Sequence, residues 1–341
     1  MILGQVALAA RLGVPAKSVV VSVLRRGQLI ARGISSIPPD VLPVVFLRHG
    51  QSTWNKQNIF IGMTDTPLTE DGIEEARGAG SLLKDSPEYC QFDMVFTSLL
   101  RRSTHTVWVV LKELGLEWLP VTKDFALNER SYGALVGKNK KDCVDKFGKE
   151  QVKLWRRSWD TPPPPMDRDN SYWPYKEPRY RQLGIREEDI PLSESLKDVT
   201  KRTSIFWDAF IKPQLQQGKR ILIVGHENNL RSIIKRLDGI SDEDILHIEL
   251  PRAVPLVFHL DRKTLKPIVL KDHAEGLSGR YIMNAEQLDA IASRDHKLVY
   301  GENSTIPVPS FTSKEKRVAE NTAKWTIHHN IRSAVATKDV K

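Results

Sequence analysis

Two short apolar runs, each ending at a histidine, dominate the pattern of the chain. Residues 44–47 are all apolar and lead into Arg48 and His49, and residues 221–224 are all apolar and lead into Gly225 and His226. Continuous apolar runs of this length are typical of parallel strands that are buried on both faces. The pattern therefore predicts two central strands with a histidine at the carboxyl end of each.

The segments around these runs alternate between strand and helix patterns. Residues 69–84 have acidic residues in the first turn and apolar residues at helical spacing, which predicts a helix. Residues 92–97 and 254–260 predict further strands, and Ser98 is a candidate cap for a helix that ends at Gly115. This alternation predicts a three-layer α/β/α fold with a mostly parallel central sheet.

Other parts of the chain are less regular. Residues 162–180 are rich in Pro, Tyr and Trp, which predicts a long surface loop. Beyond residue 271 the chain is polar, with short helices expected at 285–294 and 313–324. We expect a targeting or disordered segment at 1–42, a catalytic domain at 43–271, and a partly helical or disordered extension at 272–341.

Composition argues against several classes of protein. No apolar run approaches the roughly 20 residues that a membrane-spanning helix needs. Cys90 and Cys143 are the two cysteines, too few for a disulfide framework or a structural zinc site. The net charge of +9 comes largely from the two ends of the chain, and the middle is nearly balanced, so we expect neither a nucleic-acid nor a membrane partner.

The amino-terminal segment has the composition of a transit peptide. Residues 1–39 contain five Lys and Arg residues and no Asp or Glu. Arg25 and Arg26 interrupt the apolar stretch at 19–24, which disfavours a secretory signal. We therefore expect mitochondrial import, and the alternative is a disordered arm on a cytoplasmic protein.

The two strand-end histidines are the first candidates for chemistry. Ligands of parallel sheets gather beyond the carboxyl ends of the strands, where His49 and His226 are expected to lie. A single histidine in such a place is usually structural, but two at equivalent strand ends favour a function.

Several motifs extend this observation. Residues 47–55, Leu-Arg-His-Gly-Gln-Ser-Thr-Trp-Asn, resemble the phosphohistidine signature of the histidine phosphatase superfamily. Further segments resemble the cofactor-dependent phosphoglycerate mutases of that superfamily, in the family's order and over about residues 44–268. They are Gly62 with 65–69, 97–98 with 101–102, 127–135, 155–157, 161–163, 178–180, 191–196 and 254–257.

The resemblance implies an isomerase that interconverts 3-phosphoglycerate and 2-phosphoglycerate in glycolysis and gluconeogenesis. His49 would form a phosphohistidine, primed by 2,3-bisphosphoglycerate, and Glu129 would exchange a proton with the substrate hydroxyl. The resemblance also implies a small phosphorylated substrate, no metal, and a homodimer or homotetramer.

Phosphoryl transfer mainly requires positioning and charge neutralisation. We expect Arg48 and Arg102 to clamp the transferred group, because guanidinium matches phosphate oxygens. His226, if protonated, would add another donor. By resemblance, the substrate-binding residues are Asn55, Ile61, Gly62, Arg130, Tyr132, Lys140, Arg156, Arg157, Glu227 and Asn228.

Two residues depart from the mutase pattern. Ile61 stands where the family usually has Ser or Thr, and Glu227 follows His226 where the family usually has glycine. An inward Glu227 would repel substrate. An outward Glu227, or one paired with an arginine such as Arg231, would either be harmless or change which phosphorylated acid is accepted. The rival interpretations are a phosphatase, in which water accepts the phosphoryl group, and a catalytically weak protein that binds phosphorylated acids.

Overall fold

A single mixed sheet forms the centre of the computed structural model, which describes residues 37–270, 273–274 and 276–300. The strand order is β3-β2-β4-β1-β5-β6, and β7 pairs with β5. The strands are β1 (Val41–Arg48), β2 (Met94–Thr97), β3 (Val121–Lys123), β4 (Ile221–Gly225), β5 (Leu256–Asp261), β6 (Pro267–Ile268) and β7 (Arg280–Tyr281). The first four are parallel, and β5 to β7 are antiparallel.

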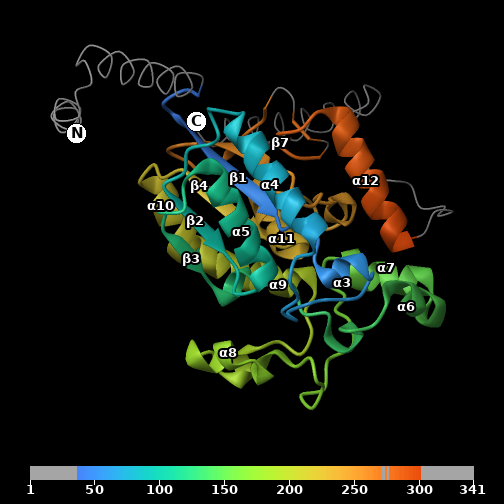
Figure 1. Ribbon diagram of the computed structural model, residues 1–341. Helices are drawn as coiled ribbons and strands as arrows, with labels where there is room; N and C mark the ends of the chain where they lie inside the picture. The colour runs from blue at the N-terminus through green and yellow to red at the C-terminus, as the bar shows by residue number, and fades with distance from the viewer. Residues whose placement is uncertain (1–36, 271–272, 275, 301–341) are drawn as a thin grey trace, which may run out of the picture.

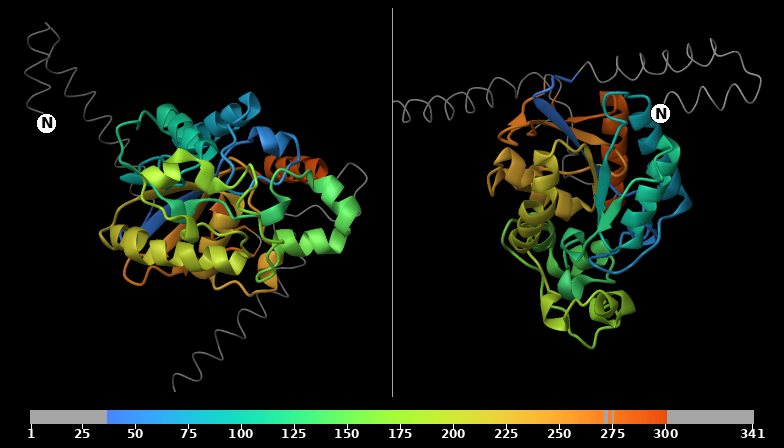
Figure 2. Two further views of the ribbon diagram at one scale, coloured as in Figure 1. Left: turned by 90° about the horizontal axis from the view of Figure 1, so that it is seen from below. Right: turned by 90° about the vertical axis from the view of Figure 1, so that its left-hand side faces the viewer.

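Alternate side chains of β1 enter two different cores, which explains its continuous apolar run. Val45 and Leu47 pack with α4 (Glu70–Lys84) and α5 (Arg101–Leu114). Val44 and Phe46 pack with helices on the opposite face, namely α9 (Leu196–Phe206), α10 (Lys212–Gln216) and α11 (Glu227–Asp238). The sheet therefore lies between two helical layers, as Figures 1 and 2 show and as the sequence predicted.

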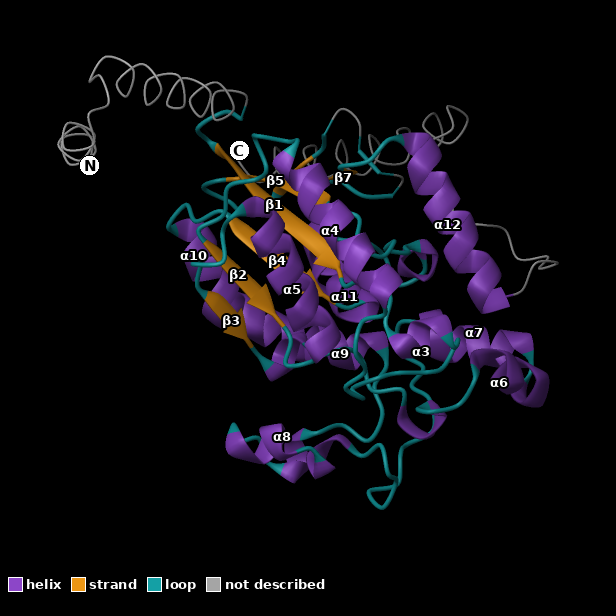
Figure 3. Cartoon of the chain, viewed as in Figure 1, coloured by secondary structure: helices purple, strands orange, loops and turns teal. Residues whose placement is uncertain are grey.

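The segment between β3 and α9 forms the side of the molecule beyond the strand ends (Figure 3). It contains α6 (Lys140–Phe147), α7 (Lys149–Arg157) and α8 (Pro178–Gln182), and α3 (Thr53–Lys56) lies near α6 and α7. The segment at 162–180 is largely irregular, as predicted. The predicted end of the loop at residue 180 is wrong. Pro178 begins α8, because a proline is tolerated in the first turn of a helix, where no amide hydrogen is needed.

Ser98 does not cap α5 as predicted. The helix begins after Leu100, which makes no side-chain capping bond, whereas Ser98 Oγ accepts the Leu100 amide and contacts His226. The prediction of Gly115 as the terminator is confirmed, since its φ of 67° is the left-handed conformation that favours glycine. The helix at 69–84 is also confirmed, with Thr69 as its cap.

The sheet and its core continue past residue 271, where the catalytic domain was expected to end. Strand β7 pairs with β5, and Leu288 and Ala292 of α12 (Ala285–Tyr300) are buried in the same core as Phe46. The helix predicted at 285–294 is present and longer. The helix predicted at 313–324 and the expected leader lie outside the described residues. No helix in the described ranges is long and apolar enough to cross a bilayer.

Candidate active site

The parallel pairing of β1 and β4 brings the two predicted histidines together. Arg48 is in register with Gly225, and the His49 amide donates to the Gly225 carbonyl at 3.1 Å. The two imidazole ring centroids are 5.0 Å apart, and the side chains are almost inaccessible, with His49 3% exposed and His226 0%. Both rings therefore lie in one buried site at the carboxyl edge of the sheet.

A close backbone approach fixes the turn that follows His49. A Cβ atom added to Gly50 would lie 2.1 Å from the Gly72 carbonyl oxygen, so no larger residue fits there without movement. Gly72 lies in the first turn of α4 and faces the Gln51 carbonyl in the same way, at 2.0 Å. The start of α4 therefore packs directly against the end of β1 and holds His49 in place.

The hydrogen bonds of His49 define its tautomer. Nδ1 lies 2.6 Å from the Gly50 carbonyl, which can only accept, so Nδ1 bears the proton. Burial, followed by the charges of Arg102 and Arg48, holds the pKa of His49 well below its usual value. The ring is therefore neutral, and its Nε2 lone pair is the nucleophile that attack on phosphorus requires.

Arg102 is the cation closest to this lone pair. Its Nε donates to His49 Nε2 at 3.3 Å, and its two terminal nitrogens donate to the carbonyls of Thr64 and Gly62 at 2.8 and 2.9 Å. Burial lowers the pKa of Arg102 to about 10, so the guanidinium stays charged near neutral pH. The 62–64 loop therefore orients a fixed positive charge beside the nucleophile.

His226 is held by Ser98. Ser98 Oγ lies 2.8 Å from His226 Nε2 and also accepts the Leu100 amide, so the hydroxyl can donate to Nε2 and leave the ring proton on Nδ1. Burial, followed by Arg102 and His49, holds the pKa of His226 well below its usual value, which favours the neutral ring in the ligand-free protein. Nδ1 is buried and has no partner among the described residues, which suits it to donate to a bound oxyanion.

Glu129 lies beside the first turn of α11. One carboxylate oxygen accepts the Arg130 amide at 2.6 Å, and the other accepts the Asn228 amide at 3.4 Å. The Asn228 side chain donates to the Tyr132 hydroxyl at 3.1 Å and accepts from Arg231 at 2.9 Å. These contacts gather a carboxylate and two polar groups at the first turn of α11, the helix that follows His226.

Glu227 points inward and is paired with two arginines. Arg48 Nη2 lies 3.0 Å from one carboxylate oxygen, and Arg157 contacts the other oxygen and also pairs with Glu249. Burial opposes the charge of Glu227, but Arg157 and Arg48 outweigh this effect and hold the Glu227 pKa well below its usual range. Glu227 is thus paired with arginines, one of the possibilities left open by the sequence, but its partners are Arg48 and Arg157 instead of the example Arg231. Arg48 also donates to the Leu250 carbonyl.

The remaining predicted residues form a basic wall from the segment after β3. Lys140 is half-buried at the start of α6, and burial, with a smaller effect of Arg156, lowers its pKa to about 7. Arg130 reaches the carbonyls of Trp155 and Arg156 at 2.8 and 3.0 Å, and its guanidinium lies over the Tyr132 ring. Glu227 connects this wall with the histidine pair, because its charge acts on Lys140 and it pairs with Arg48, the residue before His49.

Asn55 and Ile61 are predicted site residues that do not belong to this basic wall. Asn55 Oδ1 accepts from the Ser52 amide at 3.0 Å, which closes the capping box of α3 and orients the Asn55 amide. Ile61 is buried, and no hydroxyl stands there, but the next residue supplies a carbonyl to Arg102. Across the described residues, no three His, Cys, Asp or Glu side chains gather as a metal site.

Comparison with known proteins identifies the family of this chain. The model of the histidine phosphatase superfamily (branch 1) matches residues 44–272. The chain belongs to the histidine phosphatase superfamily. It is 43% identical over 247 residues to a 2,3-bisphosphoglycerate-dependent phosphoglycerate mutase of Treponema denticola, covering 72% of this chain and 94% of that one.

Solved structures of a phosphatase share the fold. A mycobacterial glucosyl-3-phosphoglycerate phosphatase, solved with VO3, superposes with a TM-score of 0.51 at 19% identity and covers 66% of this chain and 96% of its own. The native structure of the same enzyme gives 0.50 at 18% identity, with 67% and 96% covered. At this identity the likeness establishes the α/β architecture alone.

Sequence reasoning missed part of this superfamily member's site. Ser98 was assigned to a helix cap, and no local signal pointed to its contact with a histidine 128 residues away. Arg202 and Glu194, which surround the backbone of Glu129, were also missed, although Glu194 stands within the resemblance at 191–196.

Proposed function

We propose that this protein is a phosphoglycerate mutase that interconverts 3-phosphoglycerate and 2-phosphoglycerate in glycolysis and gluconeogenesis through a phosphohistidine at His49. The observation that supports this most is the 43% identity to the Treponema denticola mutase over 94% of that enzyme's length. The neutral His49 beside Arg102 and His226 supplies the chemistry that such a reaction needs.

His49 performs the covalent step in this proposal. Nε2 forms a bond to phosphorus while the bond to the leaving oxygen breaks, and the Gly50 carbonyl stabilises the positive charge that develops on the ring. Arg102 and the Nδ1 proton of His226 neutralise the oxyanion charge. The first turns of α5 and α11 add the positive ends of their dipoles.

Glu129 moves the proton. When the phosphoryl group leaves His49 for a substrate hydroxyl, the P–N bond breaks, a P–O bond forms, and Glu129 accepts the hydroxyl proton. In the reverse direction the same carboxyl group returns the proton to the leaving alkoxide. Its position next to the Asn228 amide, two residues after His226, suits both steps.

The donor set fits 2,3-bisphosphoglycerate, which would supply the phosphoryl group that primes His49. Nε and Nη1 of Arg130, like Nδ1 of His226, are buried and have no hydrogen-bond partner among the described residues. Together with Lys140 and Arg156, they can bind a second phosphate and a carboxylate away from the group at His49.

A coupled assay with and without 2,3-bisphosphoglycerate tests the proposal. We expect 3-phosphoglycerate to be converted to 2-phosphoglycerate with little inorganic phosphate released, and the primer to raise the rate of unphosphorylated enzyme. Release of inorganic phosphate as the main product would instead identify a phosphatase. Binding of 3-phosphoglycerate without turnover would identify a binding protein.

We also propose that the protein acts in mitochondria, on the basis of the acid-free, basic segment at residues 1–39. Fusion of residues 1–42 to a fluorescent protein tests this directly. Mitochondrial fluorescence is expected, and diffuse cytoplasmic fluorescence would contradict it.

Self-association as a homodimer or homotetramer is a further proposal, supported by the resemblance to phosphoglycerate mutases. Light scattering of the purified chain, for which a monomer mass of 38.7 kDa is the reference, distinguishes these states. A monomer at micromolar concentration would contradict the proposal.

A further inference from the structure

Glu129 lies on an irregular segment that regular secondary structure does not hold in place. It follows a short helical turn, Phe125–Leu127, and precedes another, Gly133–Leu135. A group that exchanges a proton must be placed within a fraction of an ångström of its target. The contacts that hold this segment are therefore part of the catalytic geometry.

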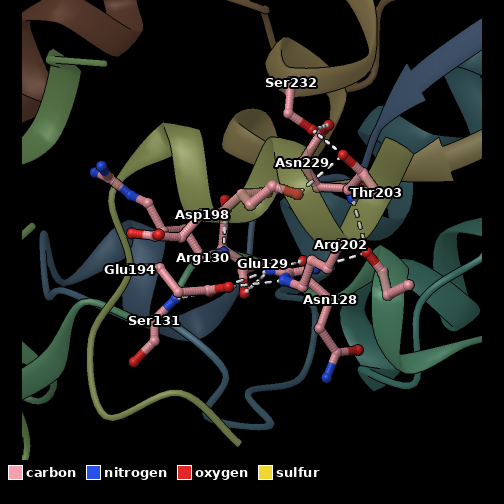
Figure 4. Close-up of polar contacts among 12 residues, drawn as sticks. Asn128, Glu129, Arg130, Ser131, Glu194, Asp198, Arg202, Thr203, Asn229 and Ser232 are labelled. Carbon is pink, nitrogen blue, oxygen red and sulfur yellow. Dashed lines mark hydrogen bonds and ion pairs between the residues drawn. The ribbon is translucent and has the colours of Figure 1, made fainter. Parts of the chain in front are cut away.

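An arginine and a glutamate surround the segment from both sides (Figure 4). Arg202 Nη1 donates to the Ala126 carbonyl at 2.6 Å, and Nη2 donates to the carbonyls of Asn128 and Glu129 at 3.0 and 3.2 Å. Glu194 accepts from the Ser131 amide at 2.8 Å and pairs with Arg202 Nε at 2.7 Å. The pair thus contacts the backbone before, at and after Glu129.

The two helices behind this pair also position the Glu129 carboxylate. Arg202 belongs to α9, whose first turn is closed by a capping box between Ser195 and Asp198. The next residue, Thr203, contacts Ser232 of α11 at 2.9 Å (Figure 4). Because α11 supplies the Asn228 amide to the Glu129 carboxylate, the α9 and α11 pair fixes both the backbone and the side chain of Glu129.

The chemistry of the pair suits positioning more than stability. Glu194 is buried and the Arg202 side chain is largely so, and an ion pair of this kind gains little net stability because desolvation offsets its attraction. Guanidinium is planar and permanently charged, so it can hold several carbonyl oxygens in one fixed arrangement. A lysine at this position could not satisfy three carbonyls and a carboxylate together.

We propose that Arg202 and Glu194 are positioning residues that set the catalytic geometry of Glu129. This inference rests on the proposed function, because it takes Glu129 as the group that exchanges the proton. It concerns an arginine that binds the Glu129 carbonyl and a glutamate that holds this arginine and the Ser131 amide.

A double-mutant cycle tests this role. The phosphoenzyme is prepared with labelled 2,3-bisphosphoglycerate, and the rate at which 3-phosphoglycerate discharges it is measured for Arg202→Met, Glu129→Gln and the double variant. We expect Arg202→Met alone to slow discharge about tenfold or more, since general acid-base catalysis contributes about 100-fold or more. In the Glu129→Gln background the same substitution should change the rate less than twofold.

Equal slowing by Arg202→Met in both backgrounds would overturn the proposal, since it would show an effect independent of Glu129. An unchanged rate in the single variant would overturn it too. Failure of the proposed function has a different signature, because the wild-type label would then be discharged as inorganic phosphate.

Two further variants separate positioning from damage to the fold. Glu194→Gln keeps the shape and an acceptor for the Ser131 amide, so it should fold and should slow discharge less than Arg202→Met. Arg236→Met is the matched control, because Arg236 of α11 pairs with the exposed Asp208 and donates to the Ser204 carbonyl at 3.1 Å. Its discharge rate should stay within twofold of the wild type, and a loss equal to that of Arg202→Met would contradict the proposal.

Discussion

Glu227 forms an ion pair with Arg48 at 3.0 Å, at the end of β1 and directly before His49. Its other carboxylate oxygen is bound by Arg157, so one partly buried carboxylate neutralises two of the cations proposed to bind substrate. An incoming phosphate or carboxylate must therefore compete with Glu227 for these guanidinium groups.

Replacement of the Glu227 carboxylate should increase the affinity for anions and lower the stability of the ligand-free protein. In Glu227→Gln we expect inorganic phosphate to bind about tenfold more tightly, or about 1.4 kcal/mol. We also expect the ligand-free variant to lose about 2 kcal/mol of unfolding free energy, less than a fully buried pair would cost because the Glu227 side chain is 16% exposed. Calorimetric titration and thermal unfolding with and without phosphate measure both effects.

Glu249→Gln is the control for this experiment. Glu249 also pairs with Arg157, but its side chain is 26% exposed and it does not reach Arg48. It should change phosphate affinity by less than Glu227→Gln does. Weaker phosphate binding in Glu227→Gln would show that Glu227 does not compete with the anion.

Lys140 should make the reaction pH-dependent near neutrality. Burial lowers its pKa to about 7, so Lys140 is charged below this pH and neutral above it. As pH rises through about 7, the free enzyme loses a cation, and kcat/KM should fall, since this parameter reports pKa values of the free enzyme. Deprotonation of His49 and His226 should not raise kcat/KM near neutral pH, because the pKa values of both rings are held well below the usual value for histidine.

Lys140→Arg is the matched variant, since arginine keeps its charge throughout this range. The ionisation of the substrate phosphate is common to both proteins, so a comparison of the two profiles isolates the lysine. We expect the fall in kcat/KM around pH 7 to disappear in Lys140→Arg. A fall that persists unchanged would assign it to another group.

The strand ends were predictable from sequence because their causes are local. The apolar runs at 44–47 and 221–224 require burial on both faces, and a parallel sheet places the residues that follow them at one edge. His49 and His226 were therefore expected to meet before any distance was known.

Contacts between side chains that are far apart in the sequence could not be predicted in the same way. Arg157 and Glu227 are 70 residues apart, and no periodicity indicates that they pair. Ser98 precedes a helix, so the local rule assigned it to a cap, but the buried His226 Nε2 needs a polar partner and takes its hydroxyl. In both cases the requirement to satisfy buried polar groups across the fold decided the outcome.

The contact between Gly50 and Gly72 predicts a steric effect on the site. Gly50→Ala would place its Cβ 2.1 Å from the Gly72 carbonyl, so β1 and α4 must separate, at a cost of about 3 kcal/mol in unfolding free energy. Activity should fall with it, because His49 is the adjacent residue. Chemical denaturation and kcat measure the two effects.

Gly78→Ala, in α4 itself, has the opposite expected effect on stability. A Cβ at Gly78 meets no atom within 4 Å, so this substitution should stabilise the protein by about 0.5–1 kcal/mol and leave kcat unchanged. Equal stability losses in Gly50→Ala and Gly78→Ala would contradict the packing argument.

The phosphorylated state of His49 is the most direct test of the central claim. The wild-type protein and His49→Asn are mixed with radiolabelled 2,3-bisphosphoglycerate, quenched, and assayed for protein-bound label that is stable in alkali and labile in acid. The account predicts about one label per wild-type chain, discharged by 3-phosphoglycerate, and none in His49→Asn. Label that persists in His49→Asn, or wild-type turnover without any labelled protein, would contradict it.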